Sequence, residues 1–236
     1  MPMVAPAKLW TIDEVRALPD DGRRFELIDG TLIVNGVVAP DGDLASLDPA
    51  MTPSPSWTHQ MAVPLLWQIL HSYVTRHRIG YAIVAPADVL LGATKVVQPD
   101  VFVVPSVGGV MPRDWAEAGR VLLAVEVLSL SSARTDRILK REFYLREGVP
   151  EYWIVDVNTR AVERWRQGDT RAELLGERLE WSPQGAIEPL VIDLDGYFSS
   201  VALTHRMKSS DCGASDNRGI TSFTPGSDHL TSPPTA

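Results

Sequence analysis

The chain has 236 residues, of which 44% are hydrophobic, and this is enough for one ordinary domain with a core, or one domain with tails. The formal net charge of −8 argues against a protein that coats nucleic acid through bulk electrostatics, so a DNA contact would need a local basic patch. The single cysteine, Cys212, excludes an internal disulfide and a cysteine-rich zinc site.

The N-terminus has no basic segment followed by a long apolar one, and no apolar stretch approaches the length of a bilayer span. We therefore expect a soluble, cytoplasmic protein with no membrane and no disulfide partner. Residues 1–23 are expected to form an N-terminal extension with a short helix, TIDEVRAL, capped by Thr11. Residues 24–203 are expected to form one domain. Residues 204–236 are polar and rich in Ser, Thr, Gly and Pro, which predicts a disordered tail.

Turn and helix signals organise the first half of the domain. Asp29-Gly30 lies between two apolar runs, Arg24–Ile28 and Thr31–Val34, and predicts a β-hairpin. The segment 38–56 is rich in Asp, Pro, Gly and Ser and predicts a loop. A helix is expected over about residues 57–77, with Ser56 as a candidate cap and with Pro64 predicting a kink or a late start.

Short apolar runs then predict strands at YAIVAP, DVLLG and QPDVFVVP, followed by a loop over 106–119 with a helical turn. The stretch 121–156 predicts a strand, a helix from Arg134 to Glu147 and a second strand, EYWIVD. Ala161–Arg166 alternates as an edge strand does, and Trp181–Leu194 offers one weak strand. This order predicts a mixed α/β (α+β) domain with a twisted central sheet, rather than a doubly wound fold.

Glu126 is the one charged residue in the apolar strand that begins at Val121. A carboxylate buried in a sheet must be paired, coordinate a metal or become neutral. Asp100 opens the preceding apolar strand, so the two carboxylates converge if these strands pair. Paired acids on adjacent strands suit Mg²⁺ or Mn²⁺, which bind through one or two carboxylates together with waters and substrate phosphate. Such a site could support phosphodiester hydrolysis, because the metal activates a bound water.

The helix between the two strands adds a lysine. At 100° per residue, one face of this helix carries Asp136, Leu139, Lys140, Phe143 and Tyr144. A lysine on the face that packs on the sheet needs a carboxylate, and Glu126 is the obvious partner. Held there, Lys140 could orient the attacking water or stabilise charge on the phosphate.

Four segments carry a resemblance to a known family: ELIDG, TPSPSWTHQ, QPDVFVV and EVLSLSSARTDRILKREFYLREGVPEYWIVD. Over about residues 24–201 the chain resembles the Uma2 (DUF820) family of restriction-endonuclease-like proteins in the PD-(D/E)XK nuclease superfamily. The resemblance implies a restriction-endonuclease-like core and a metal held by Asp100 and Glu126. It also implies that Glu26, which matches an acid near the family's N-terminus, adds to the metal site.

The lysine of the (D/E)XK motif would fall at position 128, which is Leu128 here. The family shows the same departure and carries a lysine on the following helix, which corresponds to Lys140. Where the family commonly reads SPST, this chain has Ser129-Leu130-Ser131-Ser132, which changes the loop but not the acids.

Structural alternatives stay open for each residue. Asp100 could be a solvated or salt-bridged strand-end acid, Lys140 a snorkelling surface lysine, and Asp136 a partner of Arg137 or Lys140 within its helix. His59 fits a first-turn helix residue, although a histidine beside carboxylates could assist proton transfer. The aromatic residues Tyr144, Tyr152 and Trp153 fit the core.

The best basic group is on the same helix and has a net charge of +2, from five cations (Arg134, Arg137, Lys140, Arg141, Arg146) against Asp136, Glu142 and Glu147. A charged helix surface explains it equally well. Two functions therefore remain: a Mg²⁺-dependent endonuclease acting on DNA, expected as a homodimer because double-strand cleavage needs two sites, or a catalytically inactive nuclease-fold module that binds DNA or protein.

Overall fold

The computed structural model describes residues 8–39, 44, 56–92 and 94–206. The predicted disordered tail beyond residue 206, Cys212 and most of the predicted loop over 38–56 lie outside the described residues. Within the described part of the chain, no helix is long and apolar enough to cross a membrane.

A six-stranded sheet forms the centre of the fold, in the order β11–β10–β9–β8–β7–β4. Its strands are β4 (Gly80–Val84), β7 (Val101–Pro105), β8 (Leu123–Val127), β9 (Glu151–Asp156), β10 (Ala161–Arg166) and β11 (Glu173–Leu175). Only β8 and β9 pair in parallel, and the helical segment between them supplies the crossover that a parallel pair requires. The predicted mixed α+β class is confirmed.

That crossover consists of α4 (Ala133–Thr135), a π-helical turn η4 (Asp136–Lys140) and α5 (Arg141–Arg146). The predicted helix over Arg134 to Glu147 is therefore present, with a wider turn at its middle. π-turns are rare and often mark functional sites. Here the turn spans the lysine predicted to face the sheet.

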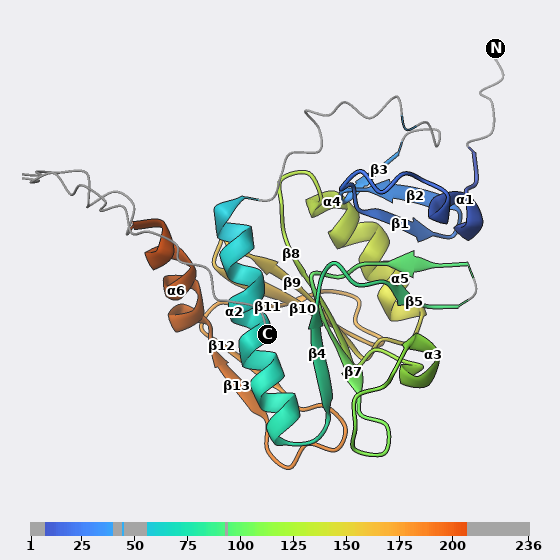
Figure 1. The fold of residues 1–236 in the computed structure, drawn as a ribbon. Helices are drawn as coiled ribbons and strands as arrows, with labels where there is room; N and C mark the ends of the chain where they lie inside the picture. Colours follow the sequence, from blue (N-terminus) through green and yellow to red (C-terminus); the bar gives the residue numbers. More distant parts are fainter. Residues whose placement is uncertain (1–7, 40–43, 45–55, 93, 207–236) are drawn as a thin grey trace, which may run out of the picture.

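A second sheet, in the order β3–β2–β1–β6–β5, lies beside the first (Figure 1). It contains β1 (Phe25–Ile28), β2 (Thr31–Val34), β3 (Val37–Val38), β5 (Val89–Leu90) and β6 (Val96–Val97). The predicted hairpin is present, because β1 pairs with β2 around Asp29 (φ 49°) and Gly30 (φ 81°). The short helix α1 (Ile12–Arg16) packs near it and has the predicted Thr11 cap.

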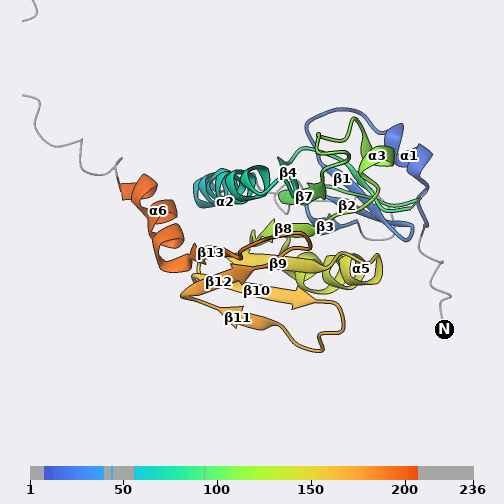
Figure 2. The ribbon, with the colours of Figure 1, turned by 90° about the horizontal axis from the view of Figure 1, so that it is seen from below.

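Helices cover both faces of the central sheet (Figure 2). On one face lie α2 (Trp57–Arg76) and α6 (Leu194–Arg206), together with the hairpin of β12 (Arg178–Trp181) and β13 (Leu190–Asp193). On the other face lie α5 and α3 (Trp115–Ala118). α2 begins at the predicted cap Ser56 and passes through Pro64, so the predicted late start is wrong.

One expectation for the C-terminal half is wrong. Ala161–Arg166 is not an edge strand, because β11 pairs on its outer side and forms the edge instead. The weak strand expected over Trp181–Leu194 is present as β13, and it pairs with β12, which lies almost entirely before that range and was not predicted. The helix α6 was not predicted, although four buried residues recur at helical spacing in it: Leu194, Tyr197, Phe198 and Val201.

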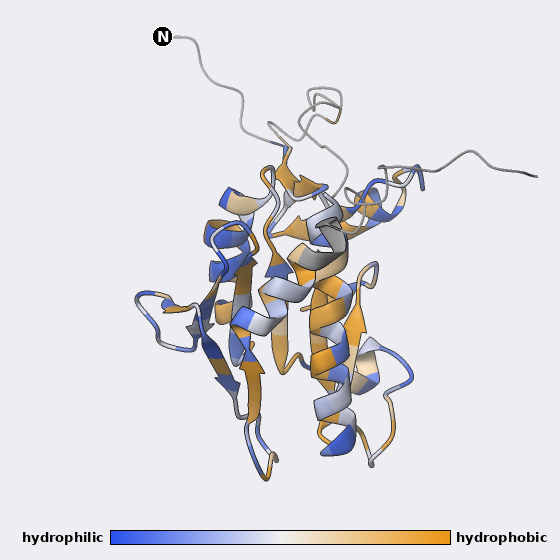
Figure 3. Cartoon of the chain, turned by 90° about the vertical axis from the view of Figure 1, so that its left-hand side faces the viewer, coloured by the Kyte–Doolittle hydropathy of each residue, from blue (hydrophilic) through white to orange (hydrophobic). Residues whose placement is uncertain are grey.

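Alternation along the strands divides the core into layers. In β7, β8 and β9 the odd-numbered residues, such as Val103, Val125 and Trp153, pack with α2 and α6. The even-numbered residues, such as Phe102 and Ala124, face the crossover and the second sheet. The strands carry mainly hydrophobic residues (Figure 3). Asp100 and Glu126 are even-numbered, so the pleat directs both toward the crossover.

Candidate active site

Three acids, on β1, on β8 and directly before β7, point into the layer between the two sheets. Val101 pairs with Val125 across β7 and β8, so the next step of the ladder sets Asp100 beside Glu126. Glu26 lies on β1, on the same face as Ile28, which belongs to this layer. All three are buried, with exposed fractions of 0% for Glu26, 4% for Asp100 and 1% for Glu126. The structure therefore brings together the acids expected at the site.

Lys140 lies at the centre of this cluster and is fully buried. Its Nζ is 2.9 Å from Glu126 Oε1, 3.0 Å from Glu26 Oε2 and 3.6 Å from Asp136 Oδ1. The snorkelling alternative for Lys140 is thus wrong. Burial alone would lower the pKa of Lys140, but the charges of Glu126 and Glu26 outweigh burial and raise it, so the ammonium group stays charged.

Asp100 has a different set of partners. Arg24 Nη1 lies 3.0 Å from Asp100 Oδ1, while Asp100 Oδ2 accepts a 2.8 Å hydrogen bond from Val127 N and lies 3.2 Å from His59 Nε2. Burial alone would raise the pKa of Asp100, but the hydrogen bond with His59 and the charge of Arg24 hold it well below its usual value. Asp100 is therefore ionised, and the solvated alternative for it is wrong.

Glu126 and Asp136 are harder to ionise. Burial raises the pKa of Glu126 well above its ordinary value, against the opposing charge of Lys140. Burial also raises the pKa of Asp136 from 3.8 to about 6. Around Lys140, three carboxyl groups thus share one cation, and burial favours the neutral forms of Glu126 and Asp136.

Three contributors were not assigned a site role from the sequence. Arg24 is 76 residues from Asp100, so only the fold reveals the pair. Tyr144 is a core aromatic as predicted, but its hydroxyl also donates to Glu126 Oε1 at 3.3 Å. Asp136 is 1% exposed, and its position four residues before Lys140 on the same helix face was the available signal.

The donor chemistry of the cluster fits a hard divalent cation. Carboxylate oxygens suit Mg²⁺ or Mn²⁺; neither oxygen of Asp136 accepts a hydrogen bond of ordinary geometry, and Glu26 Oε2 is paired with Lys140 Nζ at 3.0 Å. Within the described residues, no three Asp, Glu, His or Cys side chains are arranged to hold an ion together as they stand. A metal would therefore be bound by one or two carboxylates and by waters, after those oxygens release Lys140.

The predicted basic group is largely committed to ion pairs within the protein. Arg137 pairs with Asp156 and Glu163, and Arg146 pairs with Asp29 and Glu147. Arg141 pairs with Glu142 and lies over the ring of Trp165. With Lys140 buried as well, this helix presents much less free positive charge to DNA than its sequence implies.

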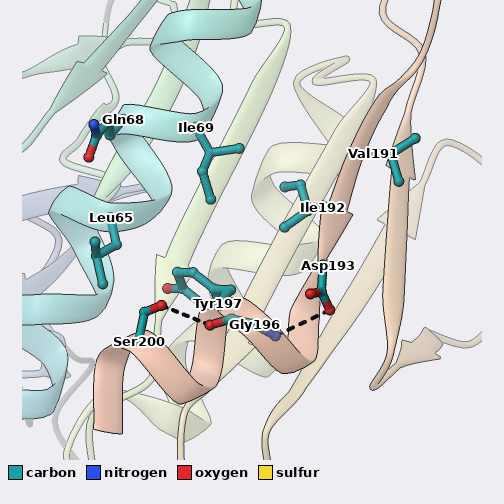
Figure 4. A pocket seen from close by; sticks show the side chains of 9 residues that line it. All are labelled: Leu65, Gln68, Ile69, Val191, Ile192, Asp193, Gly196, Tyr197 and Ser200. Atoms are coloured by element: carbon teal, nitrogen blue, oxygen red, sulfur yellow. Dashed lines mark hydrogen bonds between the residues drawn. The ribbon is translucent and has the colours of Figure 1, made fainter. Parts of the chain in front are cut away.

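A groove between α2 and α6 is separate from the acids (Figure 4). It is lined mainly by apolar side chains, among them Leu65, Ile69 and Ile192. Its polar groups bond locally, because Gly196 N donates to Asp193 Oδ1 and Ser200 Oγ donates to Gly196 O. It contributes none of the charged groups described above.

A mixed sheet crossed by a helix that carries a lysine to two strand-borne acids defines a restriction-endonuclease-like protein. Residues 12–193 match the Uma2 family, which is described as "Putative restriction endonuclease". Because the match spans most of the chain, the protein belongs to the Uma2 family.

A solved structure supports the same fold. It is the crystal structure of "a putative nuclease belonging to DUF820" from Anabaena variabilis ATCC 29413. The TM-score is 0.59 at 18% identity, covering 81% of this chain and 99% of that one. No curated protein matches the chain. Family and fold together indicate a nuclease.

Proposed function

We propose that this protein is a Mg²⁺-dependent endonuclease that hydrolyses phosphodiester bonds of DNA. The observation that carries the proposal is the buried meeting of Glu26, Asp100, Glu126 and Lys140 between the two sheets. Asp100 and Glu126 would hold the metal, and Glu26 would add a third carboxylate. When bound, Mg²⁺ (or Mn²⁺) would supply charge to the phosphoryl oxygens and lower the pKa of a bound water.

The protein's own groups would prepare the site. Hydrogen bonding and Arg24 keep Asp100 ionised, so it is ready to bind a cation. Lys140 stays charged and would position the attacking water or the phosphate. Exposure of side chains increases from 6% at Asp100 to 13% at His59 and 25% at Arg24. The substrate would therefore approach along Arg24 and His59.

A homodimer acting on DNA in the cytoplasm completes the proposal. Double-strand cleavage needs two active sites, and each chain would supply one. A second copy would also enlarge the surface that contacts phosphate, which matters because the basic helix residues are already paired with acids.

A second candidate is a catalytically inactive module that keeps this fold for binding DNA or protein. The observation that favours it is the neutralisation of the acids by Lys140 and Arg24, which hold the oxygens that a metal would need.

One experiment separates the two candidates. Wild-type protein is incubated with plasmid DNA over a range of Mg²⁺, Mn²⁺ and salt concentrations, beside Asp100→Asn, Glu126→Gln and Lys140→Met. Asp195→Asn is the control, since its side chain is 69% exposed on α6. We expect cleavage by wild type and control, and a loss of at least 100-fold in each site variant. If wild type and all variants leave DNA equally intact, the protein is not this enzyme.

A further inference from the structure

Asp136 is a buried acid whose position lowers the stability of the folded protein. It is 1% exposed, and neither of its carboxylate oxygens accepts a hydrogen bond of ordinary geometry, although the nearby Ser132 side chain partly offsets the rise that burial causes in its pKa. Its nearest cation, Lys140, is 3.6 Å away, while the same ammonium group lies within 3.0 Å of two other acids. A buried carboxylate with so little compensation destabilises the fold. Stability alone therefore does not explain an aspartate here.

The contacts of Lys140 suggest what the residue does. An ammonium group has three N–H donors, and Glu26 and Glu126 take the two short contacts. The two oxygens in these contacts, Glu26 Oε2 and Glu126 Oε1, belong to the residues proposed to bind the metal. A divalent cation and Lys140 would therefore compete for the same atoms.

A lysine that lost both glutamates would be left in a buried site. Without another acid nearby, the buried ammonium group would have no partner to hold it in the site. Asp136 is within ion-pair distance and bonds neither glutamate. It lies at the other end of the same π-turn, so both groups are held by one rigid element.

We propose that Asp136 is a positioning residue that holds the Lys140 side chain in place while Glu26 and Glu126 are engaged by a divalent cation. This rests on the proposed metal-dependent function. Asp136 thereby makes cation binding easier, because the exchange leaves the ammonium group with a partner. Its effect on cation affinity must then pass through Lys140.

A double-mutant cycle on the full chain tests this dependence, with Ca²⁺ alone as the probe and calorimetry as the readout. We expect Lys140→Met to bind Ca²⁺ more tightly than wild type, because the competing ammonium group is gone. Asp136→Asn should bind about tenfold more weakly. In the Lys140→Met background, Asp136→Asn should change the affinity by less than about twofold. Glu142→Gln, which removes an exposed acid from the same helix segment, is the charge control.

Other outcomes overturn the proposal in distinct ways. An equal loss in both backgrounds would make Asp136 a direct ligand or a simple source of negative charge, and no loss in the wild-type background would remove any role. A wild type that binds neither Ca²⁺ nor Mn²⁺ would overturn the metal-dependent function together with this inference.

A second measurement needs no lysine variant, in case Lys140→Met does not fold. The ¹⁵Nζ resonance of Lys140 reports whether the ammonium group is held in the buried site, where its protons are shielded from exchange with water. With Ca²⁺ present, this resonance should persist in wild type and be lost from Asp136→Asn. Its persistence in both proteins would contradict the proposal.

Discussion

Replacing Asp136 with asparagine should stabilise the protein at neutral pH, although it removes one partner of a buried lysine. Burial, opposed by Lys140, raises the pKa of Asp136 from 3.8 to about 6. The folded state therefore binds the Asp136 proton more tightly than the unfolded state does. A difference of about two pKa units corresponds to roughly 3 kcal/mol. Asp136 lowers the free energy of unfolding by about this amount once it must ionise.

The direction of the pKa shift determines the pH range over which wild type and Asp136→Asn differ in stability. Below about pH 4 Asp136 is protonated in both states, so wild type and Asp136→Asn should be equally stable. As pH rises from about 4 to about 6, wild type loses stability and the variant does not, so the advantage of the variant should grow over this range and level off above about pH 7. Urea unfolding in EDTA at several pH values measures the difference. Asp195→Asn is the control. The reasoning is refuted if Asp136→Asn is less stable than wild type at pH 8, or if the difference in stability between the two does not change with pH.

Two further substitutions test the surroundings of the cluster. Lys140→Met should lower the free energy of unfolding at pH 8 by about 3–5 kcal/mol in EDTA, because Glu26 and Glu126 lose their cation. Added Ca²⁺ should restore part of this stability, which thermal unfolding would measure. Gly36→Ala should lower the free energy of unfolding, measured in urea, by about 1–3 kcal/mol more than Gly92→Ala does. Both glycines have φ above +80°, but only at Gly36 would the new Cβ lie 2.6 Å from Ser132 Cβ. Equal losses at the two glycines would contradict this contact.

The acids and the lysine were predictable because local rules determine them. An apolar run interrupted by Glu126 has only a few physical explanations, and the helix period places Lys140 on the packed face. Strand pairing then follows from Asp100 opening the neighbouring run. The register of β7 and β8 is consistent with that reasoning at each step.

The partners of the acids were less predictable, since they depend on long-range contacts. Arg24 reaches Asp100 only because the second sheet lies against the first, and no local pattern shows that arrangement. β10 was misassigned as an edge strand for a similar reason. Its alternation is real, but β11, only three residues long, carries too weak a pattern to reveal that it pairs outside. In α6, Gly196 and Ser200 obscure a helical period that its apolar residues do carry.

The distribution of charge limits how this nuclease fold can hold DNA. Arg137 and Arg146 lie on the segment that also carries Lys140, yet each is paired with acids of other elements. Those pairs fix the crossover helix against β9, β10 and the β1–β2 turn, and this fixes the position of Lys140. The same cations cannot at once hold the helix and neutralise phosphate. If DNA is the substrate, as proposed, its affinity would then come from a bound cation at the acids, from Arg24 at the entrance, or from a second subunit.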